Sequence, residues 1–338
     1  MTKIERIKAA IEGRKPDSIP YAIWTHLPGI DMDPVRLAEA TFEFYKKYDV
    51  DFIKTMNNGM YPIEDLGCTV DYSEISSGGV AKILDTPVKA VEDWSKVKAT
   101  SIEEGALARE LTSLRLLLEM TKGEVPVIFT VFSPITTADK LSNKCLLEHI
   151  KNGDGQEVHK ALEAITQTTC KLVERAVELG ADGIFFASQM SSYNIMSEEL
   201  YQEYGAYYDK RVIAASKGWF NVLHAHGENI MFNLLEQYPV QVFNWHVWES
   251  LPALEEANMM TGKCVMGGIK RMDITNHNKN ELQNQIYECV KQLKGRGHIL
   301  TPGCVIRYPV DEEMLEYIKK AKCKVEAALL KQEIAQKG

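Results

Sequence analysis

The alternation of short apolar runs with amphipathic helical segments is the feature that most constrains the fold of this chain. Eight runs have the length and composition of buried strands, and helical patterns separate them, among them residues 34–48, 197–215 and 279–293. These runs are residues 20–24, 51–56, 125–131, 182–187, 219–223, 240–245, 264–267 and 298–301. The pattern predicts an α/β fold of the (β/α)8 TIM-barrel type, with a doubly wound open sheet as the alternative.

One excursion interrupts this rhythm after the second run. Between Thr69 and Leu84 the polar and apolar residues alternate around a Gly78-Gly79 pair, and a helical pattern then covers residues 101–122. We therefore expect a β-hairpin and helix inserted after strand 2. No linker, low-complexity segment or longer repeat divides the chain, so residues 1–338 are expected to form a single domain.

Charge and cysteine usage narrow the class of protein. With a formal net charge of -8, the chain as a whole does not attract nucleic acid or an anionic membrane electrostatically. The opening residues lack the apolar core of a signal peptide, and no stretch approaches the ~18 apolar residues of a transmembrane helix, so we expect a cytoplasmic protein. Seven scattered cysteines indicate reduced thiols that serve metal binding or a single reactive site.

Polar side chains gather where the expected strands end, which is where the active site of a TIM barrel lies. The residues at these positions are His26, Asn57, Ser133, Gln189, His224, His226, Trp245, His246, Gly267, Gly268 and Cys304. Four of the eight histidines of the chain are among them, so this end of the barrel is the expected functional face.

His224, His226 and Cys304 form the candidate metal site. The two histidines are spaced i and i+2 on an extended segment, which places both rings on one side, and Cys304 closes the eighth strand at the same mouth. Two imidazoles and one thiolate suit zinc and leave a fourth position open for a substrate. The plain alternative is a pair of hydrogen-bonded rim histidines and a buried cysteine.

Several segments resemble the uroporphyrinogen decarboxylase superfamily along nearly the whole chain. The segments that carry the resemblance are residues 6–13 with Asp17-Ser-Ile-Pro20, Phe132-Ser-Pro-Ile-Thr-Thr-Ala138, Met196-Ser-Glu-Glu-Leu-Tyr201 and Phe243-Asn-Trp245. The arginine-rich segment and the aspartate with which the decarboxylase holds its substrate are missing. Trp24-Thr-His-Leu-Pro-Gly29 and Asn57-Asn58 stand in their places, and Pro302-Gly-Cys304 replaces a late Gly-His-Gly motif. A tetrapyrrole with eight carboxylates would therefore meet too few cations.

The chain is more similar to the corrinoid-linked methyltransferases of this superfamily, such as the methylcobalamin:coenzyme M type. Those enzymes bind zinc through a His-x-Cys pair on strand five and a cysteine on strand eight. His224 and Cys304 match two of these ligands, and His226 stands where the family has its first cysteine. The exchange of a thiolate for an imidazole lowers the negative charge of the site by one.

The resemblance implies methyl transfer between a small substrate and the cobalt of a corrinoid. Zinc would either lower the pKa of a thiol acceptor or polarise the leaving heteroatom of a methyl ether or similar donor, and the imidazole in place of a thiolate favours the second role. A corrinoid-binding Asp-x-His-x-x-Gly segment is missing from the sequence. The corrinoid (cobalamin) is thus expected on a partner protein, with neither nucleic acid nor membrane as partner, and a homodimer is compatible with the sequence.

Further residues at the strand ends are candidates for supporting roles. Asn57, Gln189 and Tyr193 can orient a substrate by hydrogen bonds, and His26 or His246 can serve as proton donor or fourth ligand. Trp24, Trp245 and Trp248 can face a planar cofactor, and Gly267 with Gly268 can bind an anion at a helix N-terminus. Packing is the plain alternative for the tryptophans, loop capping for Asn57, and rim positions for Tyr193 and His26.

Two other functions remain open at the level of the sequence. One is a metal-free decarboxylase of a small carboxylate, with Arg307 or Arg271 holding the anion. The other is a non-enzymatic module that binds a corrinoid protein. Stoichiometric zinc that is lost on Cys304→Ala would exclude the decarboxylase.

Overall fold

The computed structural model describes residues 1–77, 80–153 and 155–335, and at its centre is a parallel sheet of seven strands. The strands are β1 (Ile53–Lys54), β4 (Val127–Phe132), β5 (Gly183–Ser188), β6 (Val222–Ala225), β7 (Val242–Trp245), β8 (Cys264–Ile269) and β9 (His298–Pro302). They lie side by side in chain order, each parallel to the next. This order is that of a barrel wall, whereas a doubly wound sheet reverses its order partway.

The prediction of a first strand at residues 20–24 is wrong. Residues 20–25 form two isolated bridges, Tyr21 with Leu300 and Thr25 with Ile306, in place of a regular strand. The N–H group of Tyr21 donates to the carboxylate of Asp51 at 2.9 Å, and Pro20 has no N–H to donate, so a continuous ladder cannot form.

The same segment nevertheless connects the two edges of the sheet. The N–H of Ala22 donates to the carbonyl of Leu300 in β9 at 3.1 Å, and the N–H of Asp51 donates to the carbonyl of Tyr21 at 2.8 Å, two residues before β1 begins. Residues 20–25, which were expected to form the first strand, therefore lie between β9 and the residues before β1 and are held by a few backbone hydrogen bonds.

One strand begins later than expected because a side chain, and not the neighbouring strand, accepts a backbone hydrogen bond. The run 219–223 predicted the fifth strand, but β6 begins at Val222, because the N–H of Asn221 donates to the side chain of Gln241. β6 also ends later than expected, at Ala225, so His224 lies inside it. Trp245 is likewise the last residue of β7, and Gly267 and Gly268 lie inside β8, so these three also sit within strands.

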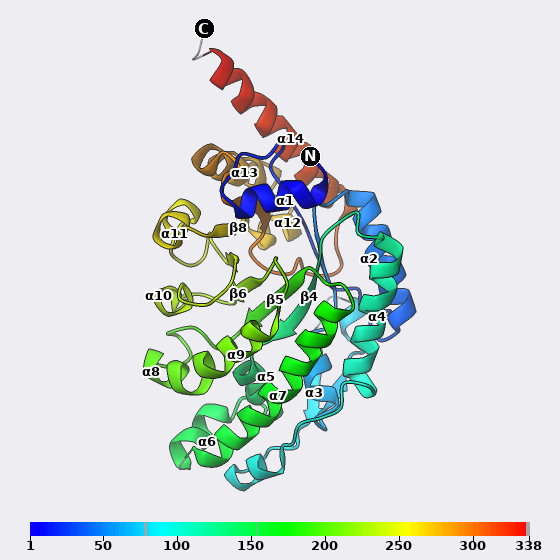
Figure 1. Cartoon of the computed structure of the whole chain (residues 1–338), viewed down its shortest axis with the longest axis vertical. Helices are drawn as coiled ribbons and strands as arrows, with labels where there is room; N and C mark the ends of the chain where they lie inside the picture. Colours follow the sequence, from blue (N-terminus) through cyan, green and yellow to red (C-terminus); the bar gives the residue numbers. More distant parts are fainter. Residues whose placement is uncertain (78–79, 154, 336–338) are drawn as a thin grey trace.

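Helices surround the sheet, and α14 projects beyond the rest of the molecule toward the C-terminus (Figure 1). The α-helices are α1 (Lys3–Ile11), α2 (Pro34–Tyr48), α3 (Tyr61–Glu64), α4 (Gly105–Thr121), α5 (Pro134–Leu141), α6 (Leu146–Asn152), α7 (Gln156–Glu178), α8 (Glu198–Tyr201), α9 (Tyr207–Ala215), α10 (Phe232–Leu235), α11 (Leu254–Thr261), α12 (Arg271–Thr275), α13 (Lys279–Leu293) and α14 (Glu312–Ala335). Two 3-10 helices, η1 (Ile75–Ser77) and η2 (Val91–Lys96), and a π-helical turn η3 (Gln202–Ala206) complete the set.

Local chemistry explains where several helices begin and end. Asp33 caps α2 by accepting hydrogen bonds from the N–H groups of Val35 and Arg36, and Pro34 occupies the first turn. The segment 197–215 was expected as one helix, but η3 separates α8 from α9. Gly205 lies in η3, where a Cβ would come within 2.7 Å of the Tyr201 ring, so the glycine makes room for that ring.

Between β1 and α4, β2 (Thr69–Asp71) and β3 (Lys82–Asp85) pair antiparallel in a separate two-stranded sheet. Gly78 and Gly79, which suggested a hairpin there, lie outside the described residues.

The strands are buried on both faces, as expected for a parallel sheet wrapped by helices around a filled interior. Trp24, Phe185, Phe52 and Phe220 form a chain of ring contacts with centroid distances of 5.1–6.4 Å. None of the helices in the described part of the chain combines the length and apolar character of a bilayer crossing.

Candidate metal centre

Four metal-binding side chains meet at the carboxyl ends of β6, β7 and β9. They are His224 in β6, His226 just beyond it, His246 after β7 and Cys304 after β9, and their ligand atoms all lie within 4.8 Å of one another. Three of the four side chains are buried and His226 is partly exposed. The cluster includes the three residues that the sequence proposed as metal ligands and one that it proposed as a proton donor or fourth ligand.

The orientation of His224 follows from the register of β6 and β7. His224 pairs with Asn244 across the strands, and the His224 Nδ1 and Asn244 Oδ1 atoms are 2.6 Å apart. Asn244 is fixed in turn because its amide donates to the carbonyl of Met266 at 2.8 Å. With Nδ1 donating to an oxygen, Nε2 carries the lone pair and is the ring atom available to a metal.

His246 shows the same division between its two nitrogens. Its Nδ1 lies 3.0 Å from the carboxylate of Glu249, and its Nε2 is buried without a hydrogen-bond partner among the described residues. Leaving a buried polar atom unpaired costs about 1–3 kcal/mol, so such atoms are rare outside functional sites. A metal ion at the centre of the cluster would satisfy this nitrogen.

His226 and Cys304 contact each other directly, with 3.6 Å between the Cys304 Sγ and the His226 Nδ1. The His226 ring is 4.9 Å from the His246 ring and 5.9 Å from the His224 ring, centroid to centroid. Donors bound tetrahedrally to zinc lie roughly 3.3–3.8 Å apart, given bonds of about 2.0–2.3 Å. Small side-chain rotations therefore suffice to bring the four donors to one ion.

The electrostatics keep all three imidazoles neutral at neutral pH. Burial lowers the pKa of His226 and of His246 to about 4, with further repulsion from neighbouring cations, and it lowers the pKa of His224 well below the usual range. Burial raises the pKa of the Cys304 thiol, and Arg271 and Lys54 oppose that shift. Neutral rings are ready ligands, while the thiol would lose its proton on binding a metal.

The chemistry of the donor set indicates which metals this cluster could hold. Three imidazoles and one thiolate are borderline-soft ligands that suit zinc, and they are poor ligands for magnesium or calcium. Bound zinc would be surrounded by a single negative charge, which leaves the site with a net charge of +1.

Three other proposed residues are not members of the cluster. His26 is partly exposed, and burial followed by repulsion from Lys54 lowers its pKa to about 4. Asn57 is buried and donates to Glu110 at 2.6 Å, which leaves its Oδ1 without a partner among the described residues. The backbone N–H of Gln189 donates to Thr136 at 3.0 Å.

Tyr193 is not brought to the cluster. Its side chain is 45% exposed, and its hydroxyl donates to Glu198 at the start of α8. Tyr193 was proposed only because it follows an expected strand, and the loop that contains it places the side chain at the surface.

The residues proposed for cofactor binding make packing contacts. The Trp245 indole donates to the carbonyl of Pro252 at 3.1 Å, and the Trp24 ring belongs to the interior aromatic chain. A Cβ on Gly267 would touch Leu254 at 3.4 Å, and Gly268 has a φ of +110° with Cys289 directly beside it. These contacts explain the two glycines by the close approach of α11 and α13.

Several residues that surround the cluster were not predicted from the sequence. Lys54, Asn244 and Glu249 orient ligands or add charge there, and none was singled out. A lysine within an apolar run and an asparagine within an expected strand were the available signals. Arg271 was named as an anion holder for a decarboxylase, and it lines the same small hollow as His246 and Cys304.

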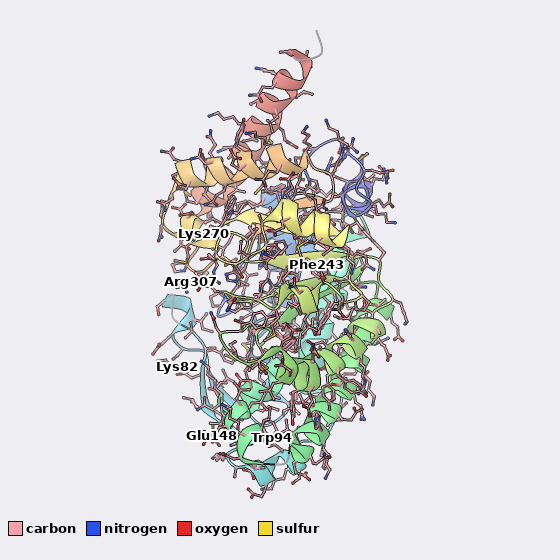
Figure 2. All side chains as sticks on the ribbon, turned by 90° about the vertical axis from the view of Figure 1, so that its left-hand side faces the viewer. Lys82, Trp94, Glu148, Phe243, Lys270 and Arg307 are labelled. Carbon is pink, nitrogen blue, oxygen red and sulfur yellow. The ribbon has the colours of Figure 1, made fainter. Side chains whose placement is uncertain are left out.

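Arg307 was the other proposed anion holder, and it is exposed. Figure 2 shows Arg307 on the same side of the molecule as Lys270, which follows β8.

Comparison with known proteins gives a consistent family match. Residues 2–322 match the protein-family model described as Uroporphyrinogen decarboxylase (URO-D). A methylcobamide:CoM methyltransferase of Methanosarcina acetivorans is 25% identical over 154 residues, which cover 46% of this chain and 44% of the relative. The matched part of this relative is therefore less than half of its length.

Two further relatives are similar over almost the whole chain. A methylated-thiol–coenzyme M methyltransferase of Methanosarcina mazei is 21% identical over 341 residues, covering 95% of this chain and 89% of that protein. A solved structure described as a methyltransferase from Methanosarcina mazei superposes with a TM-score of 0.83 at 16% identity, covering 96% and 99% of the two chains. At this identity the superposition establishes the fold.

Proposed function

Because the chain belongs to the uroporphyrinogen decarboxylase (URO-D) family, we propose that it is a zinc-dependent methyltransferase. In this proposal it moves a methyl group between a small substrate and a corrinoid carried by a separate protein. The substrate is a methyl ether, another methylated compound or a thiol. Named relatives are methyltransferases that act on methylcobamide or methylated thiols together with coenzyme M, which supports this class of reaction.

The single observation that carries the proposal is the convergence of His224, His226, His246 and Cys304 within 4.8 Å, with the His246 Nε2 buried and unpaired among the described residues. Zinc bound there would supply Lewis acidity toward the heteroatom that bears the methyl group. A site with one thiolate is more electrophilic than one with two, so activation of a methyl donor is favoured over activation of a thiol.

The residues of the chain have separate tasks in this scheme. Asn244 and Glu249 hold the rings of His224 and His246 through Nδ1, which would leave the Nε2 of each ring to bind the ion. Burial of the cluster limits the access of water to the reacting group. If the substrate bound the metal, it would have to replace one of the four side chains. His246 would be the ligand best placed to dissociate, because Glu249 could hold the released ring.

A corrinoid protein would approach the open end of the barrel. Loops that follow β5 and β7 expose apolar side chains there, namely Ile195, Trp248 and Leu251, with exposed fractions of 39–80%. Apolar side chains around an active-site opening are typical of a surface that docks a protein partner.

The test combines metal analysis with cobalt spectroscopy. The purified wild-type protein should contain one zinc per chain, and Cys304→Ala should lower the zinc content at least tenfold, since one ligand and the only thiolate of the cluster are gone. Cys264→Ala is the matched control, because Cys264 is equally buried but lies at the opposite end of β8 and should leave the zinc unchanged.

The zinc-loaded protein, a corrinoid protein and a methyl donor should together shift the cobalt absorption to that of the methylated form, and Cys304→Ala should abolish this shift. A wild-type protein without zinc, or one whose activity survives Cys304→Ala, would contradict the proposal and favour the metal-free decarboxylase.

A further inference from the structure

The buried side chain of Asn57 has one satisfied and one unsatisfied polar atom. Asn57 lies in the loop after β1 and is only 4% exposed. Its Nδ2 donates to the carboxylate of Glu110 at 2.6 Å, whereas its Oδ1 has no hydrogen-bond partner among the described residues. Leaving a buried carbonyl oxygen unpaired costs about 1–3 kcal/mol, so this oxygen calls for an explanation.

Glu110 determines which way the Asn57 amide faces. Glu110 lies in α4 and is completely buried. One of its carboxylate oxygens accepts the hydrogen bond from Asn57, and the other accepts one from the Nε of Arg109 at 3.0 Å. An ionised carboxylate has no hydrogen to donate, so only the NH2 group of Asn57 can face it. The Oδ1 of Asn57 is consequently turned away from α4.

The negative charge of Glu110 is supported by the arginine beside it. Burial raises the pKa of Glu110 to about 7, and Arg109 and Asn57 oppose that shift. Arg109 is held in turn by two hydrogen bonds to Glu64 in α3, at 3.0 and 3.1 Å. Tyr72, directly after β2, donates to the same Glu64 at 2.9 Å. The orientation of Asn57 is therefore fixed by a chain of hydrogen bonds that reaches the separate two-stranded sheet.

The loop after β1 borders the candidate metal centre. The ammonium of Lys140 donates to the carbonyl of Gly59 in this loop at 2.8 Å, and repulsion from Lys140 contributes to the low pKa of His226. On the side of β1, the Phe185 ring lies 4.9 Å from the ammonium of the last strand residue and stacks on His224, with 5.2 Å between the centroids. The unpaired oxygen thus lies at the same end of the barrel as the cluster.

Asn221 shows the contrasting arrangement of a structural asparagine in the same fold. It is equally buried, but its Oδ1 accepts hydrogen bonds from the backbone N–H of Ile184 at 3.2 Å and from the hydroxyl of Ser216 at 2.6 Å. Its Nδ2 donates to the carbonyl of Gly218 at 3.0 Å. Both ends of that amide are satisfied within the protein, whereas only one end of Asn57 is.

We propose that the Oδ1 of Asn57 accepts a hydrogen bond from an N–H or O–H group of the substrate, and that Glu110 is the positioning residue that keeps this oxygen facing the substrate. The inference rests on the proposed function and narrows the substrate class to molecules with a hydrogen-bond donor close to the group that the metal activates. A molecule with only an acceptor at this point would place two oxygens against each other without a hydrogen between them, so the site discriminates against it.

The experiment measures binding of three small thiols to the zinc-loaded protein by titration calorimetry. Thiols are chosen because the thiolate anchors each probe at the zinc. 2-Mercaptoethanol carries a hydroxyl donor, 1-propanethiol has a methyl group in its place, and 2-methoxyethanethiol carries only an acceptor. The titrations are run at about pH 8, where Glu110, with its pKa of about 7, is mostly ionised.

The first comparison tests the contact of Asn57 with the probe. We expect wild type to bind 2-mercaptoethanol at least about fivefold more tightly than either of the other two thiols, because both lack the donor. Asn57→Ala should reduce this preference to less than about twofold, since the accepting oxygen is gone.

The second comparison tests the positioning role of Glu110. Glu110→Gln nearly preserves the shape of the side chain, but its amide can donate to the Oδ1 of Asn57, which frees the Asn57 amide to turn its NH2 group toward the probe. The preference for 2-mercaptoethanol over 2-methoxyethanethiol should therefore fall at least about threefold, whereas loss of a merely structural contact would weaken all three thiols alike. Glu163→Gln is the matched control, because Glu163 in α7 also pairs with an arginine, Arg211, but is partly exposed.

Absent or equal binding of the three thiols to zinc-loaded wild type would overturn the inference, and so would an unchanged preference in either Asn57→Ala or Glu110→Gln. If Glu110→Gln does not fold, as judged by its thermal transition, wild type and Asn57→Ala decide the question. Zinc content is measured on every sample. A wild-type protein without zinc sinks the proposed function, while a zinc-loaded protein that does not distinguish the thiols sinks only this inference.

Discussion

At the scale of single residues, the hydrogen bond made by the Nδ1 of His224 and of His246 determines whether the Nε2 of the same ring can bind a metal. Asn244 contacts the Nδ1 of His224 and Glu249 contacts the Nδ1 of His246, so the Nε2 of each ring is left as its free ligand atom. Partners of this kind fix the tautomer and the direction of a metal-binding ring.

Asn244→Ala should therefore lower zinc affinity by about 10- to 100-fold while all four proposed ligands remain. Competition with a chromophoric chelator measures the affinity. Asn221→Ala is the matched control, because Asn221 is also buried but precedes β6, away from the cluster. Equal zinc affinities of Asn244→Ala and wild type would show that the asparagine does not orient a ligand.

The depressed histidine pKa values predict how the metal-free protein responds to acid. The pKa of His226 and of His246 is about 4 in the folded state, against a usual value near 6.5, so the unfolded chain binds more protons between these two pH values. The free energy of unfolding should thus fall as the pH is lowered from about 6.5 to about 4, and these two rings should contribute nothing above that window.

Urea unfolding of the metal-free protein across this range measures the effect. The double variant His226→Gln/His246→Gln should show a shallower dependence on pH than wild type, and His277→Gln, at an exposed histidine, should follow wild type. Parallel curves for wild type and the double variant would mean that the two rings are not buried as neutral groups.

The sequence predicted part of the site because chemistry and position coincided. His224, His226 and Cys304 combine metal-binding side chains with strand ends, and the structure brings them together. Lys54 was missed because the Phe185 ring that its ammonium contacts is distant in the sequence. Tyr193 was proposed from position alone, and its loop turns it toward Glu198.

At the scale of the elements, a buried carboxylate joins two strands to the helical stretch from α8 to α9. Asp209 in α9 accepts hydrogen bonds from Ser133 at the end of β4, and from Tyr201 and Tyr238, at 2.6–2.9 Å. Burial raises the pKa of Asp209 to about 6, and the three hydroxyl donors oppose that shift. Tyr201 also reaches Ser188 at the end of β5, at 2.7 Å.

Tyr201→Phe should lower the free energy of unfolding by about 1–3 kcal/mol, because it leaves the buried Asp209 and Ser188 with one partner fewer. Denaturant unfolding is the measurement. Tyr207→Phe is the control, since Tyr207 is 61% exposed and should change stability by less than about 0.5 kcal/mol. A loss as small as that of the control would show that the network does not hold these elements.

Helices were easier to predict than strands for physical reasons. The bounds of α2 and α13 match the expected 34–48 and 279–293, since caps and amphipathic spacing are local. The start of β6 depends on the side chain of Gln241 and the π-helical turn on the fit of Tyr201 against Gly205, and both contacts involve tertiary packing.

At the scale of the whole molecule, the alternation of strands and helices predicted the parallel wall, and seven of the eight expected strands form it in chain order. The remaining expected strand is replaced by residues 20–25, which form only isolated bridges. Their apolar composition predicted burial, but it could not show that the carboxylate of Asp51 accepts a hydrogen bond from the N–H of Tyr21. This architecture is what allows residues 80 positions apart, such as His224 and Cys304, to meet.

X-ray absorption at the zinc edge of the purified protein tests the central claim most directly. We predict one zinc per chain with a first shell of two to three imidazole nitrogens at about 2.0–2.1 Å and a single sulfur at about 2.3 Å, the sulfur being lost in Cys304→Ala. A first shell without sulfur, or a protein that binds no zinc, would contradict the proposed centre and with it the methyl transfer assigned to it.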